Sequence, residues 1–351
     1  MHEEYDPNAP GKKGSIFGFP YTQQEANIVL LPLAWDVTSS YHSGSSNGPQ
    51  SILDASVQLD LEIPDVQDAW SNPVFMLPNE ENVRKDSEAL RTRVEPYLSD
   101  LEQNYSDKKT DDSSEIVTLI NRRCQELNSK TKDKCDELIN AGKIVGIVGG
   151  DHGTPLGLVQ SLTSKYESIG ILQIDAHMDL RNAYEGFEFS HASIMRNCMK
   201  SNVITSLVQV GIRDYCQEEL SFCKHDHRIS VYFDQKIKEA LDRGASWSEQ
   251  CDRIIDQLPE HVYVSFDIDG LDPKLCPGTG TPVPGGLEFW QVVLLLQRLA
   301  TNGKHIIGFD LCEVAPVQND REWNANVGAR ILYQLTTWTA VSHGLLTYTG
   351  E

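Results

Sequence analysis

The feature that most restricts the fold of this chain is a regular alternation of short apolar runs with longer amphipathic segments. Runs of ~4–8 apolar residues are typical of strands buried on both faces of a sheet, and we expect them at 27–33, 144–148, 169–174, 206–212, 229–233, 262–267 and 305–309. Between the strands, helices are predicted at 52–61, 86–101, 116–139, 155–165, 191–199, 217–223, 247–258, 287–301 and 327–343. This alternation predicts a single three-layer α/β/α domain with a central parallel sheet.

The N-terminal 25 residues differ from the rest of the chain because they are polar and rich in glycine and proline. We predict that residues 1–25 form an arm that packs on a neighbouring subunit or stays loose. The domain itself is expected to span 26–351, since no internal repeat or linker interrupts it. Within it, the polar stretch 104–114 is predicted to be a solvated loop.

Composition restricts the partners and the location. The 351 residues carry 30 Lys and Arg against 51 Asp and Glu, a net charge of −21. Such a chain repels nucleic acid and anionic membranes, and it favours a small cationic molecule. No stretch approaches the ~20 apolar residues that a membrane helix needs. Eight scattered cysteines without a Cys-x-x-Cys pair, and a polar N-terminus without an apolar leader, predict free thiols in the cytoplasm.

Acidic residues and histidines cluster directly after three of the predicted strands. The segments are Gly149–Gly153, Asp175–Asp179 and Ser265–Pro273. Because the carboxyl ends of parallel strands open into one crevice, we expect these segments to converge there. The candidate metal ligands are His152, Asp175, His177, Asp179, Asp267 and Asp269.

The chemistry of these six side chains indicates a pair of cations. Four clustered carboxylates repel one another strongly unless positive charge compensates them, and two divalent ions supply it. An oxygen-rich set with two imidazoles suits Mn²⁺ best, with Ni²⁺ as the main alternative. We expect the neighbouring Asp151 to hydrogen-bond a ligand histidine. Asp272, before Pro273, is expected to fix a turn.

The three motifs, in this order, resemble the arginase/agmatinase (ureohydrolase) family. The resemblance extends from Leu31 to about Ser342 and includes Gly44, Gly48–Pro49 and Val210–Arg213. It implies an arginase-like fold and a hydrolase of linear amidines, in which two metal ions activate a shared water that attacks a guanidino carbon. The products would be urea and ammonia or an amine, and the implied assembly is a homo-oligomer, a trimer or hexamer.

The same resemblance implies the ligand sets and two catalytic roles. Glu313 matches the carboxylate that holds the guanidinium, and His191 matches a loop histidine that carries protons to the leaving group. The Ser-His-Ala-Ser sequence around His191 departs from the His-Gly usual in arginases and agmatinases. One metal would bind His152, Asp175, Asp179 and Asp267, and the other would bind Asp175, His177, Asp267 and Asp269, so that Asp175 and Asp267 bridge.

The segment Leu180–His191 is expected to select the substrate. Asp-Leu-Arg at 179–181 resembles formimidoylglutamases, in which an arginine pairs with a substrate carboxylate, whereas the His191 segment resembles the agmatinase-like branch, which includes enzymes for free guanidine. We expect Trp35 and Tyr184 to wall a small cavity. Arg181 would either bind substrate or support a neighbouring acid. The expected substrates, in order, are guanidine, then agmatine or a guanidino acid, then formimidoylglutamate.

Three other readings remain open at this point. A two-metal phosphatase also uses Asp and His at strand ends, but such enzymes usually have a Gly-Asn-His turn where this chain has Gly-Gly-Asp-His. A deacetylase-like amidohydrolase would bind a single zinc ion. An inactive binding module of the same family would need a lost ligand, and none is lost from the sequence.

Overall fold

A computed structural model describes residues 5–103, 115–317 and 319–350. Its centre is an eight-stranded parallel sheet with the order β3-β1-β4-β9-β8-β5-β6-β7. The six inner strands are almost wholly buried, as expected for a parallel sheet covered on both faces. In chain order the strands are β1 (Ile28–Leu33), β3 (Val74–Met76), β4 (Ile144–Gly149), β5 (Ile169–Ile174), β6 (Ile204–Ile212), β7 (Ile229–Phe233), β8 (His261–Asp267) and β9 (His305–Cys312).

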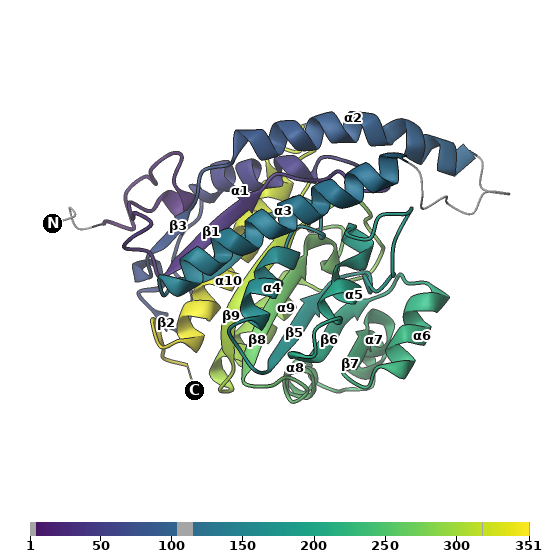
Figure 1. Ribbon diagram of the computed structural model, residues 1–351. Helices are drawn as coiled ribbons and strands as arrows, with labels where there is room; N and C mark the ends of the chain where they lie inside the picture. Colours follow the sequence, from purple (N-terminus) through teal and green to yellow (C-terminus); the bar gives the residue numbers. More distant parts are fainter. Residues whose placement is uncertain (1–4, 104–114, 318, 351) are drawn as a thin grey trace.

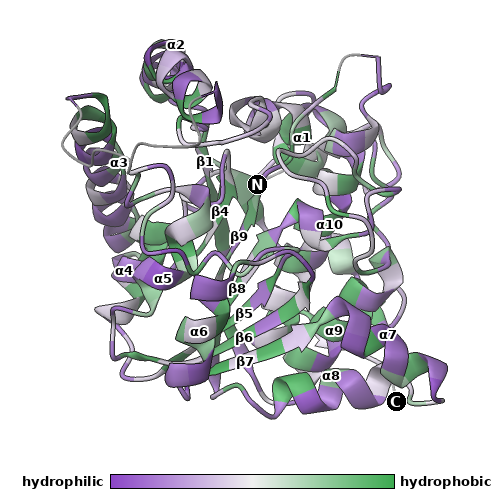
Figure 2. Cartoon of the chain, turned by 90° about the vertical axis from the view of Figure 1, so that its right-hand side faces the viewer, coloured by the Kyte–Doolittle hydropathy of each residue, from purple (hydrophilic) through white to green (hydrophobic). Residues whose placement is uncertain are grey.

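Helices cover both faces of this sheet (Figure 2). One layer contains α3, α4 and α5, and the other contains α1, α10, α9 and α7. The long helix α2 lies over the outside of α3 (Figure 1). The helices are α1 (Gly48–Ser56), α2 (Glu81–Gln103), α3 (Glu115–Asn140), α4 (Leu156–Thr163), α5 (Ile194–Cys198), α6 (Gln217–His225), α7 (Asp234–Asp242), α8 (Trp247–Ile255), α9 (Phe289–Thr301) and α10 (Trp323–Ser342).

The predicted three-layer architecture is therefore confirmed, and the differences lie at short elements. The edge strand β3 and the helix α7 were not predicted. With three residues, β3 is too short to give a clear periodicity, and α7 has a single fully buried apolar side chain, Ile237. Strand β9 continues to Cys312 instead of ending at Phe309. A further small antiparallel pair joins β2 (Val66–Gln67) to β10 (Thr347–Tyr348) near the C-terminus.

The predicted N-terminal arm is wrong for its described part. Phe17 and Phe19 are each 2% exposed and belong to the hydrophobic core. The Phe17 ring lies 5.0 Å from that of Tyr333 in α10, and its backbone N–H donates to Ser56 Oγ in α1. These aromatic side chains bury too much apolar surface to leave the segment loose, so it packs on its own chain. The predicted loop at 104–114 lies outside the described residues.

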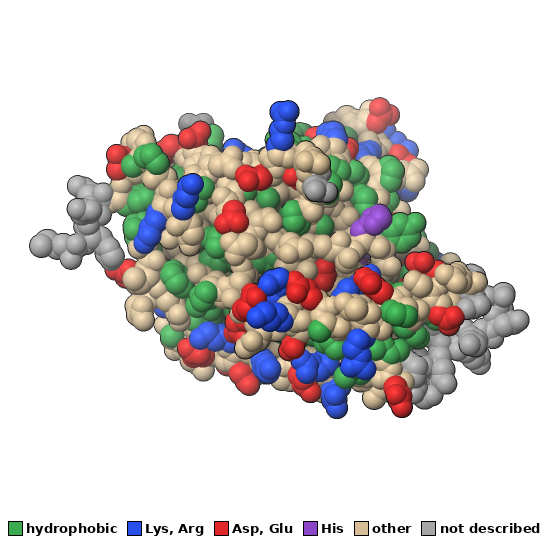
Figure 3. Space-filling view, turned by 90° about the horizontal axis from the view of Figure 1, so that it is seen from above, with side chains coloured by type: hydrophobic (Ala, Val, Ile, Leu, Met, Phe, Trp, Pro, Cys, Tyr) green, Lys and Arg blue, Asp and Glu red, His purple; other side chains and the backbone are tan. Residues whose placement is uncertain are grey.

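The exterior and the thiols agree with the compositional expectations. In the view of Figure 3, acidic and basic side chains are interspersed over the surface. All eight cysteines lie in the described ranges as free thiols, six of them buried. None of the helices within these ranges combines the length and hydrophobicity that crossing a bilayer requires.

Candidate metal centre

Two glycines shape the backbone that delivers the candidate ligands. Gly150 follows β4, donates its N–H to Leu33 O at 2.8 Å, and lies so close to β1 that a Cβ there would meet Trp35 O at 1.9 Å. Gly270 follows β8, and a Cβ there would lie 2.7 Å from the backbone nitrogen of Asp175. A side chain at either position would push apart the turns that carry the ligands.

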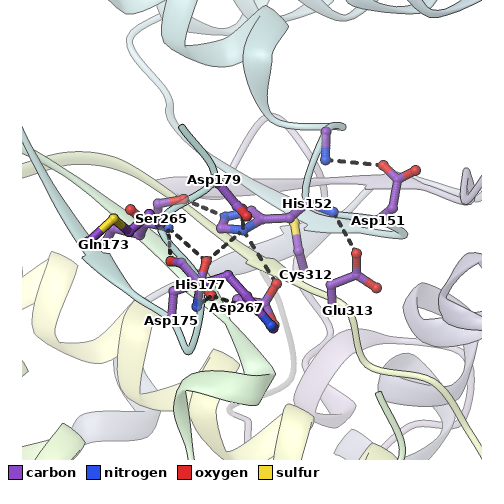
Figure 4. A network of polar contacts seen from close by, with 12 residues as sticks. Asp151, His152, Gln173, Asp175, His177, Asp179, Ser265, Asp267, Cys312 and Glu313 are labelled. Atoms are coloured by element: carbon purple, nitrogen blue, oxygen red, sulfur yellow. Dashed lines mark hydrogen bonds and ion pairs between the residues drawn. The ribbon is translucent and has the colours of Figure 1, made fainter. Parts of the chain in front are cut away.

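His152 is surrounded by carboxylates from two other strand ends (Figure 4). Its Nδ1 lies 3.1 Å from Asp175 Oδ2, 3.0 Å from Asp179 Oδ2 and 3.3 Å from Asp267 Oδ2. All four side chains are at least nine-tenths buried. The Nδ1 atom is buried without a well-formed hydrogen bond. A nitrogen lone pair facing three oxygens is the arrangement that a divalent cation completes.

His177 forms a second group on the other side of Asp175. Its Nδ1 lies 3.1 Å from Asp269 Oδ2 and 3.6 Å from Asp175 Oδ1. Asp175 therefore presents one oxygen to each histidine. Asp267 connects the groups as well, because its Oδ1 accepts from the backbone N–H of Asp269 at 2.9 Å. The six predicted ligands thus lie together as two adjoining groups that share Asp175.

Mutual repulsion perturbs the acid–base properties of both groups. Burial, together with the nearby charges of Asp269 and Asp175, raises the pKa of Asp267 well above its ordinary value. Burial and Asp175 likewise raise the pKa of Asp179 to about 7. Burial opposes the charged form of His152, but its bonds to three carboxylates raise its pKa well above the usual range. The cluster gathers four carboxylates around two imidazoles, so its donor set fits divalent cations.

Two residues of the site are held in the left-handed backbone region. Asp179 has φ = 54° and Glu313 has φ = 64°. Residues other than glycine adopt this conformation at a cost of ~1–3 kcal/mol, and such residues gather at functional sites. For Asp179 it also means that the chain turns after β5 ends at Ile174, so Asp179 does not continue the extended strand.

Glu313 lies behind the His152 group, just after β9. It is 6% exposed, and its Oε1 accepts from the backbone N–H of His152 at 3.0 Å. Burial and the nearby Asp151 raise the pKa of Glu313 well above its ordinary value. A Cβ built on Gly280 would lie 3.5 Å from Oε2, so this glycine lies against the second oxygen. Glu313 is not among the residues that line the neighbouring cavity. An arriving cation would restore the ionised form of this carboxyl.

His191 begins the short 3-10 turn His191–Ser193, which precedes α5, and it faces the loop after β1. Its Nε2 is 3.3 Å from Ser40 Oγ, and its Nδ1 is buried without a hydrogen bond to the described residues. Burial and the charges of His177 and His152 lower its pKa to about 3. A neutral imidazole at this position can accept a proton.

A cavity of about 410 Å³ opens above His177 and Asp179. Arg181 and Tyr184 form part of its wall, with the guanidinium 4.6 Å from the ring centre. The Arg181 Nε also lies 4.0 Å from Glu219 Oε2. The predicted role of Trp35 is wrong, because this side chain is buried in the core beneath α3 and the cavity lining does not include it. The remaining wall comes from Ser40, Tyr41, His42, His191, Ala192, Asp214, Tyr215, Glu219, Thr281, Pro282 and Val283.

The two neighbouring aspartates have structural partners. Asp151 points away from the ligand cluster (Figure 4) and accepts from Thr38 Oγ1 and from the backbone N–H of Gly153, so it does not bind the ring of His152 as predicted. Asp272 accepts from the backbone N–H of Lys274 at 3.1 Å and fixes the turn, as predicted.

Sequence reasoning missed a set of polar side chains inside the strands. These residues interrupt runs that are otherwise apolar, and that interruption is the signal that identifies them. They are Gln173, Gln209, Ser265 and Asp310, each at most 1% exposed.

Comparison with known proteins places this geometry in a family. A model described as the arginase family matches residues 26–337. An N(1)-aminopropylagmatine ureohydrolase of Thermococcus kodakarensis is 30% identical over 299 residues, covering 85% of this chain and 86% of that protein. A Bacillus subtilis agmatinase is 26% identical over 314 residues, covering 89% and 91%.

Solved structures show the same fold. The agmatine ureohydrolase of Thermoplasma volcanium superposes with a TM-score of 0.69 at 22% identity, covering 93% of this chain and 94% of that one. A Bacillus subtilis arginase gives a TM-score of 0.64 at 20% identity, with coverages of 88% and 98%. The chain belongs to the arginase family of ureohydrolases, hydrolases of amidine C–N bonds that use a binuclear divalent-metal centre.

Proposed function

We propose that this protein hydrolyses a small guanidino compound at a two-metal centre and releases urea with ammonia or an amine. The observation that carries the proposal is the convergence of six ligand side chains from three strand ends around His152 Nδ1 and His177 Nδ1. The buried Glu313 adjoins the same group. This combination supports amidine hydrolysis, because it pairs a cation-binding cluster with a carboxylate suited to a guanidinium.

As the family resemblance implies, the ligands would divide into two sets that share two carboxylates. Two bound divalent ions would supply an activated water and stabilise the charge that develops on the substrate. We favour Mn²⁺, with Ni²⁺ as the alternative, because the donors are mostly oxygen. His152, Asp175, Asp179 and Asp267 would hold one ion, and Asp175, His177, Asp267 and Asp269 would hold the other.

Glu313 and His191 would have two further roles, substrate binding and proton transfer. The Glu313 carboxylate would bind the planar guanidinium and set its orientation, with Oε1 already fixed by the N–H of His152. His191 would carry a proton to the departing amine, as the family resemblance implies. Ser40 would hold the imidazole through its Nε2.

The arginine of the cavity wall favours a substrate without a distal ammonium. Arg181 already presents a guanidinium to the cavity, stacked on Tyr184. A cationic tail would meet this like charge, whereas guanidine has no tail and a guanidino acid would bring a carboxylate. We therefore propose guanidine first and a guanidino acid next.

Agmatine or its aminopropyl derivative follows these two candidates. The similarity to an N(1)-aminopropylagmatine ureohydrolase and to an agmatinase favours it. Asp214 also lines the cavity with its side chain 66% exposed, so it offers a partner for a distal ammonium. Formimidoylglutamate is the last candidate, since Arg181 can pair with a carboxylate.

A substrate panel tests this order. Urea release would be measured with guanidine, 4-guanidinobutyrate, agmatine and arginine, and formamide release with formimidoylglutamate. We expect the highest kcat/KM with guanidine. In Arg181→Gln, activity on agmatine should rise relative to that on the guanidino acid by about tenfold. Arg196→Gln is the matched control, because Arg196 stacks on Phe222 and does not line the cavity. Activity restricted to formimidoylglutamate would refute the proposal.

We also propose that the chain assembles as a trimer or hexamer in the cytoplasm, as the family resemblance implies. Light scattering of the purified protein would give its mass. A monomer at micromolar concentration would contradict this assembly.

A further inference from the structure

Four buried polar side chains form a row across the middle of the sheet, one layer below the ligands. Strand register pairs Gln209 of β6 with Gln173 of β5, Gln173 with Ser265 of β8, and Ser265 with Asp310 of β9. Gln173 precedes the ligand Asp175 by two residues, and Ser265 precedes Asp267 by two. Side chains two residues apart on a strand share a face, so the row lies on the face that carries the ligands.

One half of the row holds His152. Asp310 is fully buried, and both of its oxygens accept: Oδ2 from Tyr263 OH at 2.6 Å and Ser265 Oγ at 2.8 Å, and Oδ1 from the N–H of Phe266 at 3.1 Å. Because the Ser265 hydroxyl gives its only proton to Asp310, its oxygen accepts from His152 Nε2, 2.8 Å away. The ring is thereby turned so that Nδ1 faces the carboxylates (Figure 4).

The other half holds Asp175. Gln209 Nε2 donates to Met178 O at 2.7 Å and to Gln173 Oε1 at 2.6 Å. A backbone carbonyl can only accept, so it fixes which end of the Gln209 amide is the donor, and that in turn fixes the Gln173 amide. Gln173 then directs its Nε2 at Asp175 Oδ2, 2.7 Å away, and at His177 O, 3.2 Å away. This is the same Asp175 oxygen that faces His152.

We propose that this row is a positioning layer, which sets the orientation of His152 from one side and of Asp175 from the other before a metal ion binds. It rests on the metal centre of the proposed function. Polar groups inside a parallel sheet cost free energy unless they are fully bonded, and the described bonds of this row lead to two ligands that face each other. The residues touch no substrate, and they act through the ligands alone.

The test compares a serine-to-alanine substitution at two positions in the sheet. Ser265→Ala removes the hydroxyl that holds His152, whereas Ser206→Ala removes a similarly buried hydroxyl of β6 that donates to Gln257 O, far from the ligands. Both variants should unfold at similarly lowered temperatures. The Kd for Mn²⁺, measured by competition with a chelating dye, should rise about 10- to 100-fold in Ser265→Ala and stay near the wild-type value in Ser206→Ala.

A second pair of variants tests the amide half. Gln173→Leu should weaken Mn²⁺ binding directly, and Gln209→Leu should weaken it through Gln173. The double variant should then be no weaker than Gln173→Leu alone, because the effect of Gln209 requires Gln173. Mn²⁺ affinities equal to wild type in both Ser265→Ala and Gln173→Leu would overturn the positioning layer. If the wild-type protein binds no divalent ion, the proposed function fails instead.

Discussion

The two ends of the central sheet use similar residues for different purposes. At the carboxyl end, His152 and His177 each direct Nδ1 at carboxylates. At the amino end, several lysine and histidine side chains bond to backbone carbonyls. The contacts there are Lys143 to Gln24 O and Ala26 O, Lys165 to Ile139 O, Lys304 to Leu258 O, His305 to Ser342 O and His343 to Ile306 O.

The difference follows from what each end lacks. Helices α3 and α10 terminate at the amino end, where their last carbonyls need donors, and Lys165 and His305 supply them. The carboxyl end has acceptors in excess and needs cations. A cavity of about 330 Å³ also lies at the amino end, lined in part by Lys143, Lys165 and His343. Because Lys143, Lys165 and His343 already bond to backbone carbonyls, we assign these side chains a structural role.

The largest predicted effect comes from replacing a histidine by asparagine, compared at the two ends of the sheet. His177→Asn removes a ligand and should lower kcat/KM by ~10³-fold or more, since bound metal supplies several kcal/mol of transition-state stabilisation. His305→Asn should leave kcat/KM within about twofold and lower the free energy of unfolding by about 1 kcal/mol, the value of one hydrogen bond. Steady-state kinetics and urea denaturation measure both. Equal losses of kcat/KM in the two variants would contradict the proposed difference between the two ends of the sheet.

Glu313→Gln should have the next largest effect. The substitution keeps the shape of the side chain but removes the charge that pairs with the guanidinium, so we expect kcat/KM to fall about 100-fold. Elemental analysis should still find the wild-type metal content, because Glu313 bonds the backbone of His152 and not its ring. Lost metal would move Glu313 from substrate binding to the support of the ligands.

The pH dependence of stability should report on His191. Its folded-state pKa of about 3 lies below the ordinary 6.5, so the unfolded chain binds more protons as the pH falls below about 6.5. The wild-type protein should therefore lose stability between pH 6.5 and 3, and His191→Asn should lose less. We expect a difference of about 2 kcal/mol at pH 5, measured by denaturant titration. Parallel curves would mean that His191 is accessible to protons in the folded state.

The smallest predicted effect belongs to Lys165→Met. The variant keeps the apolar stem but leaves the carbonyl of Ile139 without this donor. Stability should fall by about 0.5–1.5 kcal/mol, and kcat/KM should not change. A fall in kcat/KM without a loss of stability would show that the amino end of the sheet is energetically coupled to the site.

Much of the fold follows from the sequence because a parallel sheet imposes long apolar strands. The runs that became β4, β5 and β8 were clear for this reason, and each led to a ligand motif. Short elements such as β3 gave no comparable pattern. The packing of Phe17 against Tyr333 was not predictable either, since it joins residues more than 300 positions apart.

The regularity of the sheet also explains which residues of the candidate site could be predicted. Asp and His residues after strands indicate ligands, because the register of a parallel sheet brings strand ends together. The direction of a side chain in a loop has no such rule, and for this reason Trp35 was predicted to line the cavity although it points into the core. The polar row was readable from Gln173 and Asp310, which interrupt apolar strands, but its hydrogen bonds depend on the register between strands.

The central claim is that the carboxyl end of the sheet is a two-metal hydrolytic centre, and the number of metal ions in the active enzyme tests it most directly. Protein loaded with Mn²⁺ and freed of excess ion would be analysed for metal content and for urea release from guanidine in the same sample. We predict two ions per chain, with activity rising to its maximum as the second ion binds. Full activity with one ion per chain, or with none, would contradict the account.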